Sequence, residues 1–345
     1  MNPLVAREIS PEDYAAFLAR APHSAFHRLP WLHSITRVYP VRLTTLGFFN
    51  GARLIAVTPL LRRRMGPFEL WGAPLRKCAM PPATPCCSPP NRATDIIPAL
   101  RLWARQRRIR YLQLCLPLVE EAGDPIVPGP PDRLEPFVNL ERDLQRPLAA
   151  LWSALPKKSR YLIRKAVRSG VRIHCDHSPT LLQTQASLLQ ATYARQGPGM
   201  RPNFPLELYR ILLSRREQQG LLILSAHHQG QCVARIWVFT DADSCHYWDA
   251  ASLPAARDLN ANHLLLWCLT RWAHRHGLRT LDFIGGIGGR GDSRPGIGHF
   301  KRSLGATPRS YVMCYWYTPL LRLAFASYRL FHRLSLYRQK RTPRN

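Results

Sequence analysis

The sequence predicts a mixed α/β fold (α+β, with mostly antiparallel sheets) arranged in two similar halves. Each half contains helices, then strands joined by tight turns, then a further helix and a strand. In the first half the hairpin turn is Asn50-Gly51, and in the second Gln229-Gly230 opens a meander of three strands. This mixed order of elements is typical of α/β and α+β folds.

The first half begins with a predicted helix at residues 10–20, because Ser10 suits a helix N-cap and Pro11 suits the first turn. The remaining elements follow from hydrophobic runs and from the turn residues between them. They are strands at 42–48 and 53–61, a loop rich in Pro and Cys at 74–92, a helix at 93–108, a strand at 109–116 and a surface loop at 117–136.

The second half begins with a predicted helical stretch at residues 144–169, which Pro147 and Pro156 interrupt. The elements expected after it are a strand at 171–175, helices at 178–196 and 205–219, three strands within 221–253, a helix at 260–276, and strands at 278–283 and 311–317. We therefore predict one domain at residues 1–145, a second at 146–318, and a basic tail at 319–345.

Charge and composition restrict the partners. The chain has 345 residues, 46% of them hydrophobic, and a net charge of +28, which favours anionic partners such as nucleic acid, anionic lipid or phosphorylated substrates. Nine cysteines with scattered spacing argue against a disulfide framework or a zinc site. The N-terminus does not resemble a signal peptide, and no run of apolar residues is long enough to span a bilayer. These features predict a cytoplasmic protein that can touch the inner membrane face.

The glycine-rich stretch at residues 281–306 is the first candidate for chemistry. It contains no G-K-[ST] and no G-x-G-x-x-G that opens a helix, so it is neither a Walker-type phosphate loop nor a dinucleotide-binding turn. It is either a flexible connection or the floor of an active site. In the second case Asp282 stands at the end of a strand and the glycines let the backbone approach a ligand closely. The Lys301 ammonium would then meet developing negative charge or a phosphate.

The same stretch resembles the closing signature of FemAB-like acyltransferases, D-F-x-G-G followed by G-I-x-x-F-K-x-x-x-G-A. The matching residues are Asp282, Phe283, Gly285, Gly286, Gly296, Ile297, Phe300, Lys301, Gly305 and Ala306. Further similarity lies in LPKKSRYLIRKAVRSGVRI, in ATYARQG and in the run that begins HYWDAASL. The similarity extends over most of the chain, from residue 25 to residue 318.

The resemblance implies two tandem domains of the GNAT acetyltransferase fold. The best-known members of the family add amino acids from aminoacyl-tRNA to the peptide of a peptidoglycan precursor, and relatives include BioF2-like acyltransferases, some associated with exopolysaccharide. It implies that Lys301 stabilises an oxyanion or holds a phosphate, and that Asp282 orients Lys301 or accepts a proton. Gly285, Gly286 and Phe300 would then form the floor, with Tyr247 and Trp248 lining the cleft.

The chain departs from the family at several points. It lacks the long coiled-coil arm of some members, and Leu116-Pro117 stands where an Asp-Pro supplies a carboxylate, with Glu120 and Glu121 as possible substitutes. Asn260 stands where a glycine of the GNAT turn approaches the CoA pyrophosphate. The donor therefore stays open between acyl-CoA and aminoacyl-tRNA, each a co-substrate and neither bound permanently.

Two basic segments could bind anionic partners. On a helix, Lys157, Arg160, Arg164 and Arg168 fall on one face, with Lys158 beside them. That face is either solvated or binds phosphates of tRNA, CoA or a diphosphate-lipid precursor. In the tail, basic residues also recur on one helical face, which suits either an interfacial membrane helix or a helix docked on the protein's own core. They are Arg322, Arg329, Arg333 and Lys340.

No H-E-x-x-H or paired Cys and His spacing is present, so we expect no metal. The sequence as a whole predicts an acyltransferase that moves an acyl or aminoacyl group to an amine, or alternatively a hydroxyl, of a phosphorylated cell-envelope or polysaccharide precursor. One alternative is a GNAT-derived scaffold without catalysis that binds RNA or anionic membrane. Another is an acyl-CoA N-acetyltransferase that acts on a sugar amine or a small amine.

Overall fold

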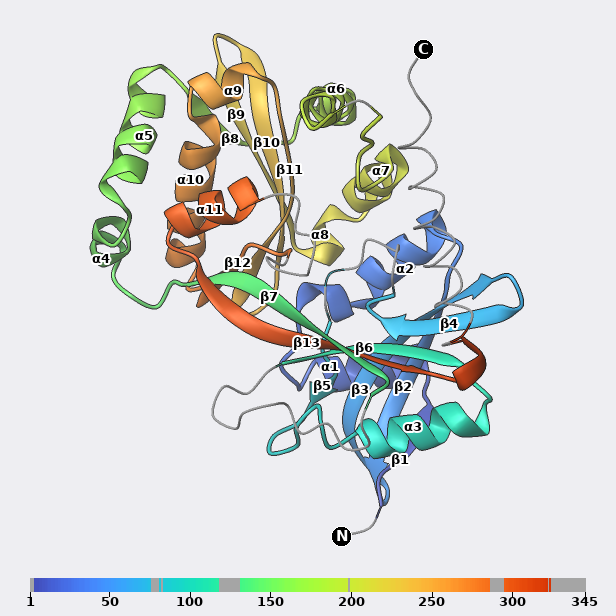
Figure 1. The fold of residues 1–345 in the computed structure, drawn as a ribbon. Coiled ribbons are helices and arrows are strands. Elements are labelled where there is room, and N and C mark those ends of the chain that lie inside the picture. The colour runs from blue at the N-terminus through green and yellow to red at the C-terminus, as the bar shows by residue number, and fades with distance from the viewer. Residues whose placement is uncertain are drawn as a thin grey trace, which may run out of the picture.

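The computed structural model describes residues 3–75, 81, 83–117, 131–197, 199–285, 295–321 and 323. Its strands join into one mixed sheet that continues through both halves of the molecule (Figure 1). The strand order across this sheet is β1-β2-β3-β4-β6-β13-β7-β12-β11-β10-β9-β8, and the short β5 pairs with β3. The mixed α/β class predicted from the sequence is confirmed.

The strands of the first half are β1 (Val5–Glu8), β2 (Arg42–Asn50), β3 (Arg53–Met65), β4 (Phe68–Ala73), β5 (Cys86–Cys87) and β6 (Tyr111–Pro117). Those of the second half are β8 (Arg172–Cys175), β9 (Leu221–His228), β10 (Gln231–Thr240), β11 (Ser244–Ser252) and β12 (Thr280–Asp282). Two long strands connect the halves, namely β7 (Arg133–Asp143) and β13 (Thr307–Tyr317).

The helices of the first half are α1 (Pro11–Leu18), the 3₁₀ turn η1 (Ala25–His27), α2 (Leu29–Val38) and α3 (Ile97–Gln106). Those of the second half are α4 (Leu148–Ser153), α5 (Lys157–Arg168), α6 (Leu181–Ala194), α7 (Leu206–Ser214), α8 (Arg216–Gln219), α9 (Ala255–Asp258), α10 (Ala261–Arg275) and α11 (Pro295–Ser303).

Both halves repeat one arrangement of strands. In the first half β2, β3 and β4 are antiparallel neighbours, and α3 leads to β6, which is parallel to β4. In the second half β9, β10 and β11 are antiparallel neighbours, and α10 leads to β12, which is parallel to β11. A parallel neighbour needs a crossover connection, and a helix provides it in each half.

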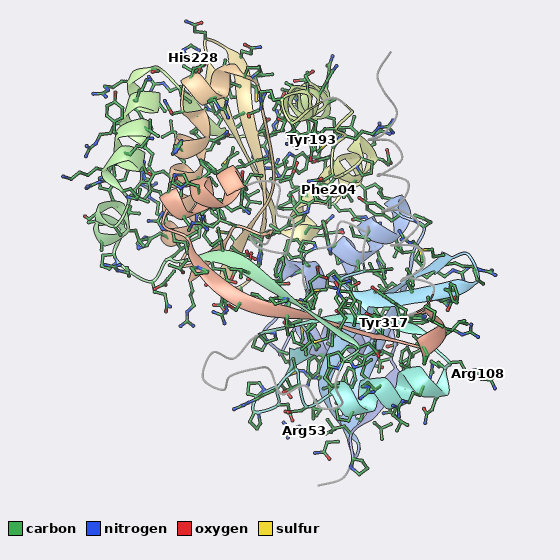
Figure 2. The ribbon with its side chains drawn as sticks, in the orientation of Figure 1. Arg53, Arg108, Tyr193, Phe204, His228 and Tyr317 are labelled. Atoms are coloured by element: carbon green, nitrogen blue, oxygen red, sulfur yellow. The ribbon has the colours of Figure 1, made fainter. Side chains whose placement is uncertain are left out.

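The final strand connects the halves. Tyr311–Tyr317 of β13 pairs with β6 of the first half, and Thr307–Tyr315 pairs with β7. Figure 2 shows Tyr317, at the end of β13, among the strands of the first half. The predicted division at residues 145 and 318 stays a prediction, and the predicted second domain donates a strand to the sheet of the first.

Three hydrophobic cores hold the layers together. One lies between α3 and the first-half sheet, and another between α5, α10 and the second-half sheet. The third joins α1 and α2 of the first half to α6 and α7 of the second. In this third core the ring of Trp248 lies 5.7 Å from Trp31 and 4.3 Å from Phe204 (centroid distances). Trp248 therefore stabilises the contact between the halves.

Several predicted elements are confirmed. The backbone N–H of Asp13 donates to the Ser10 hydroxyl at 3.0 Å, as expected for the N-cap of α1. Gly51 has a φ of +58° in the turn between β2 and β3, a conformation that favours glycine. The expected helical stretch at residues 144–169 is two helices, because Pro147 and Pro156 each stand immediately before a helix start.

Other predictions were wrong. The expected loop at residues 117–136 ends earlier, because β7 begins at Arg133, and the loop at 74–92 contains the short β5. The expected helix at 205–219 is the two helices α7 and α8. The elements that were not predicted include β1, α2, β4 and most of β7. Pro136 lies inside β7, and it argued against a central strand because proline within a sheet is usually found on edge strands.

No helix within the described residues is long and apolar enough to cross a membrane. Most of the predicted tail, including its four aligned basic residues, lies outside the described residues. Glu120 and Glu121 also lie outside them.

Candidate active site

A cavity of about 490 Å³ opens where the two halves meet. The first half contributes Ser24 and His27 from the segment around η1, and the second half contributes His246 from β11. The connecting strands provide the wall between them. The lining residues of these strands are Phe137, Asn139, Glu141, Arg309 and Tyr311, and Asp282 at the end of β12 and Ile284 two positions later complete the wall.

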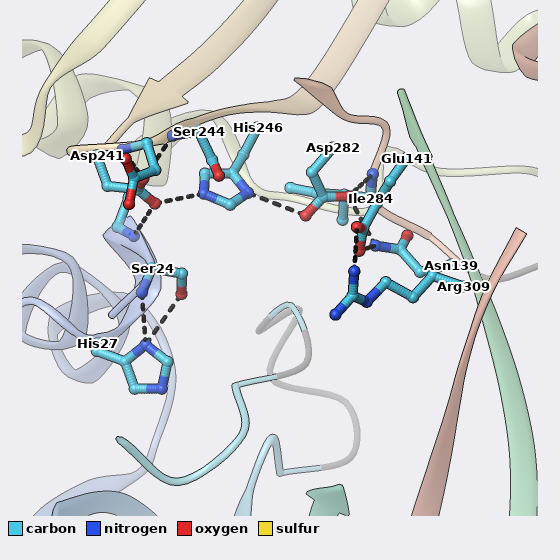
Figure 3. A network of polar contacts seen from close by, with 12 residues as sticks. Ser24, His27, Asn139, Glu141, Asp241, Ser244, His246, Asp282, Ile284 and Arg309 are labelled. Carbon is cyan, nitrogen blue, oxygen red and sulfur yellow. Dashed lines mark hydrogen bonds and ion pairs between the residues drawn. The ribbon is translucent and has the colours of Figure 1, made fainter. Parts of the chain in front are cut away.

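A buried histidine between two carboxylates forms one wall (Figure 3). Nε2 of His246 lies 2.7 Å from Oδ2 of Asp241, and its Nδ1 lies 2.9 Å from Oδ2 of Asp282. Burial disfavours the imidazolium, but hydrogen bonds to Asp241 and Asp282 outweigh it and raise the pKa of His246 to about 9. His246 is therefore a cation at neutral pH, with both ring nitrogens donating.

Asp282 is held in its ionised form. Burial opposes ionisation, but hydrogen bonds from His246, from the Asn139 amide at 2.8 Å and from the backbone N–H of Ile284 at 2.8 Å lower its pKa. Its position follows from the sheet, because Asp282 ends β12 opposite His246 of the parallel β11. Asp282 is thus a fixed negative charge.

Glu141 titrates in the opposite direction. Burial first, and then repulsion from Asp282, raise its pKa above the ordinary value. Its Oε1 accepts from the Asn139 amide at 3.2 Å and from the Tyr311 hydroxyl at 3.1 Å, and Arg309 lies 3.8 Å away. Two neighbouring carboxyl groups with pKa values pushed apart are typical of a site that combines a fixed anion with a proton acceptor.

The wall from the first half contains a second histidine. Nε2 of His27 lies 2.7 Å from the Thr84 carbonyl, which can only accept, so the Nε2 carries the proton. Its Nδ1 then accepts from the Ser24 hydroxyl at 2.9 Å. Burial lowers the pKa of His27 to about 4, so this residue is neutral at pH 7 and adds no charge to the cavity.

The network gathers carboxylates within a strongly basic protein. Three carboxylates (Asp241, Asp282 and Glu141) lie beside two cations (His246 and Arg309), whereas the whole chain carries +28. Asp241 also accepts from the backbone N–H of Ala25 and so joins the halves beside the cavity. On the cavity wall, the carboxylates of Glu141 and Asp282 favour a ligand with a positive charge, for instance an ammonium group.

Lys301 lies behind the cavity wall. Its side chain is buried, and its ammonium donates to the backbone carbonyls of Ile284 and Gly285, directly after β12. Gly285 has a φ of +93°, and a Cβ added there would lie 3.5 Å from the Lys301 nitrogen. Lys301 thus holds the first turn of the glycine-rich loop, whereas Gly286 lies outside the described residues. The catalytic role of Lys301 stays a prediction.

We expect Lys301→Met to lower the rate of acyl transfer, because the turn after Asp282 loses its ammonium. Met keeps the apolar stem but leaves buried carbonyl groups unpaired, a cost of about 1–3 kcal/mol in the free energy of unfolding. Steady-state kinetics and urea unfolding measure the two effects. Lys301→Arg, which keeps the charge, should retain more of both, and unchanged kinetics in the Met variant would contradict the role.

The other predicted site residues lie elsewhere. The predicted phosphate-binding cations all lie on α5 and do not line the cavity, namely Lys157, Lys158, Arg160 and Arg164. Arg164 contacts the Trp152 ring instead. Tyr247 packs its ring against Phe283, Trp248 lies in the core between the halves, and the Phe300 ring contacts His263. Of the predicted site residues that the structure describes, only Asp282 lines the cavity.

The turn predicted as a CoA-binding position keeps an unusual backbone. Asn260 caps α10 with a φ of +55°, in the left-handed region that glycine adopts most easily. Its side-chain amide donates to the Asp258 carbonyl at 3.1 Å. Asparagine tolerates this conformation better than most residues, so the chain keeps a glycine-like turn without glycine.

Sequence reasoning missed Glu141, His246, Asp241 and Asn139. The histidine is on a predicted strand, and Asp241 lies five positions before it, but the two form no recognisable motif. Asp282 ends β12, whereas His246 lies near the start of the parallel β11, so the positions of the strand ends gave no signal either. No group of three or more His, Cys, Asp or Glu suited to a metal ion occurs among the residues that the structure describes.

Comparison with known proteins agrees with the fold. Residues 154–302 match the acetyltransferase (GNAT) domain model. This match covers most of the second half and less than half of the whole chain. No curated protein matches the chain. Among solved structures, FemX has a TM-score of 0.66 at 13% identity, over 92% of this chain and 99% of FemX.

Two further solved structures share the fold of this chain. L-PGS from Bacillus licheniformis has a TM-score of 0.56 at 13% identity, over 93% of this chain and 96% of its own. A tandem GNAT protein from the clavulanic acid biosynthesis pathway has a TM-score of 0.52 at 13% identity, with coverages of 90% and 98%. The fold expected from the FemAB-like signature, two GNAT units in tandem, is therefore confirmed.

Proposed function

We propose that this GNAT protein is an N-acyltransferase with its active site in the cavity between the halves. It would move an acyl or aminoacyl group from an activated donor, acyl-CoA or aminoacyl-tRNA, to an amine of a cell-envelope or polysaccharide precursor. The observation that carries the proposal is the pair Glu141 and Asp282, whose pKa values are shifted in opposite directions on one cavity wall. The GNAT domain and the likeness to FemX support the reaction class.

The pair suits the chemistry of amide formation. An acceptor amine arrives as an ammonium ion, which the carboxylates of Glu141 and Asp282 attract. Glu141 accepts one proton, and the nitrogen lone pair then attacks the carbonyl carbon of the donor ester or thioester. When the tetrahedral intermediate collapses, the bond from carbon to the leaving oxygen or sulfur breaks, and the second proton of the nitrogen passes to the leaving group. No covalent enzyme intermediate is required.

Asp282 has a different task in this scheme. Because His246 keeps it ionised, it cannot take the proton at neutral pH, but it can orient the ammonium beside Glu141. Holding amine and donor together in one cavity also removes the entropy cost of their encounter.

A thermal-shift screen tests the proposal. The ligands are acetyl-CoA, longer acyl-CoAs, aminoacyl-tRNA and a UDP-linked peptidoglycan precursor, each at low and at high salt. We expect one donor to raise the melting temperature at both salt concentrations, since binding to the folded state stabilises it. Stabilisation by every polyanion that disappears at high salt would instead favour the scaffold that binds RNA or membrane without catalysis.

A further inference from the structure

The α5 region carries a concentrated positive charge without any acid. Residues 144–175 contain eight Lys and Arg and no Asp or Glu. No ion pair found within the described part of the chain includes a cation of α5. Like charges on neighbouring helical turns repel each other, so an external anion would stabilise this arrangement.

The exposed face of α5 has an aromatic residue at its centre. Ser159, Ile163 and Ala166 are buried and fix the inner face, and Tyr161 lies opposite them with 55% of its surface exposed. At helical spacing the neighbours of Tyr161 on the outer face are all cations, namely Lys157, Arg164, Lys165 and Arg168. Val167, at 50% exposure, lies at the flank. In Figure 1, α5 lies at the outer side of the second half.

Helix α3 of the first half and the residues directly after it are also rich in arginine, but acids act on two of these arginines. Arg107 forms an ion pair with Glu8 at 3.2 Å, and Asp132 acts electrostatically on Arg101. High net charge alone therefore does not explain α5, because the chain places acids beside other basic helices.

We propose that the outer face of α5 docks the protein on an anionic phospholipid bilayer. Cations attract the anionic headgroups, and a tyrosine ring among them suits the boundary between headgroups and acyl chains. Duplex RNA would match the charge but would offer no contact for exposed Tyr161 and Val167, since its bases are stacked inside the helix. Since no α5 residue lines the cavity, this docking would leave the cavity free and does not depend on the acyl-transfer proposal.

Vesicle co-sedimentation of the full chain tests the surface. The vesicles consist of phosphatidylcholine alone or of an equimolar mixture with phosphatidylglycerol. We expect binding to the mixed vesicles only, and about 100-fold weaker partitioning for K157Q/R164Q/R168Q, because each cation near an anionic leaflet contributes about fivefold. Tyr161→Ser should weaken partitioning several-fold without changing its salt dependence, and Tyr161→Phe should restore it.

The matched control is R101Q/R105Q/R108Q on and after α3, which removes the same charge and leaves α5 and the tail unchanged. Its partitioning should stay close to that of the wild type, with circular dichroism confirming that all variants are folded. Equal loss in both triple variants would show that net charge is responsible and would overturn the proposal. Binding to phosphatidylcholine alone, or α5-dependent binding to duplex RNA without binding to vesicles, would also overturn it.

Discussion

Glu141→Gln is expected to lower kcat/KM for acyl transfer by about 10²–10⁴-fold, the usual contribution of a general base. Gln keeps the size of the side chain and can still accept from Tyr311 and Asn139, so the fold should survive. What disappears is the carboxylate whose pKa burial and Asp282 raise. Steady-state kinetics with the donor and acceptor identified by thermal shift measure the effect.

The pH dependence provides a second measurement of the same residue. Transfer requires ionised Glu141 and a protonated acceptor amine, so kcat/KM should fall on both sides of an optimum. Because the pKa of Glu141 is raised, the acid limb should lie above the ordinary carboxylate range, and Glu141→Gln should abolish that limb. The alkaline limb belongs to the amine and should remain.

The matched control is Glu135→Gln on the same strand, β7. Glu135 forms an ion pair with Arg133 and accepts from Tyr315, and it does not line the cavity. Its kinetics should stay within about threefold of the wild type, as for most surface substitutions. If both glutamine variants lose activity equally, or if Glu141→Gln keeps full activity, another group accepts the proton.

The sequence predicts most of the fold because local signals agree with the tertiary structure. The capped helix at Ser10, the Asn50-Gly51 hairpin and the long meander each depend on residues close in the chain. The elements that were missed depend on distant partners. Strand β7 contains a proline and becomes a central strand only because β12 and β13 pair with it.

The candidate site was predictable only at Asp282, which the signature marks. Its neighbours come from different strands: Glu141 from β7, His246 from β11 and Arg309 from β13. Asn139 and Asp282 are 143 positions apart in the chain, yet they share a hydrogen bond of 2.8 Å. No local pattern reports such a contact.

The buried histidine explains why the site and the fold depend on each other. Asp241 links His246 to the backbone of Ala25 in the first half, and Asp282 links it to Asn139 on a connecting strand. The same ion network that sets the charge of the cavity therefore also fixes the contact between the halves. A change at its centre should affect stability as well as catalysis.

We expect His246→Gln to lower the free energy of unfolding by about 3–5 kcal/mol, the usual cost of removing one partner from a buried ion pair. Asp241 and Asp282 would be left as buried carboxylates without their shared cation. Urea unfolding at neutral pH, followed by tryptophan fluorescence, measures the loss. A variant as stable as the wild type would show that His246 is not the cation that holds the two carboxylates.

Stability of the wild type should also fall as the pH rises. The pKa of His246 is about 9 in the folded state against 6.5 for the ordinary residue, so its contribution is complete below about pH 6.5 and disappears as the pH rises through about 9. The full contribution is on the order of 3 kcal/mol. Asp241 and Asp282 have lowered pKa values in the folded state. Their contribution to stability is therefore complete above the ordinary pKa of an aspartate, and it disappears only as the pH falls through the lowered pKa.

The alkaline loss can be assigned to His246 by comparing urea unfolding near pH 6 and near pH 9.5 in three proteins. The wild type should lose stability between these conditions, whereas His246→Gln, already destabilised, should lose less. His23→Gln is the matched control, because His23 also lines the cavity but lies outside the network with Asp241 and Asp282. It should keep the dependence of the wild type, and an equal dependence in all three proteins would assign the alkaline loss to other groups.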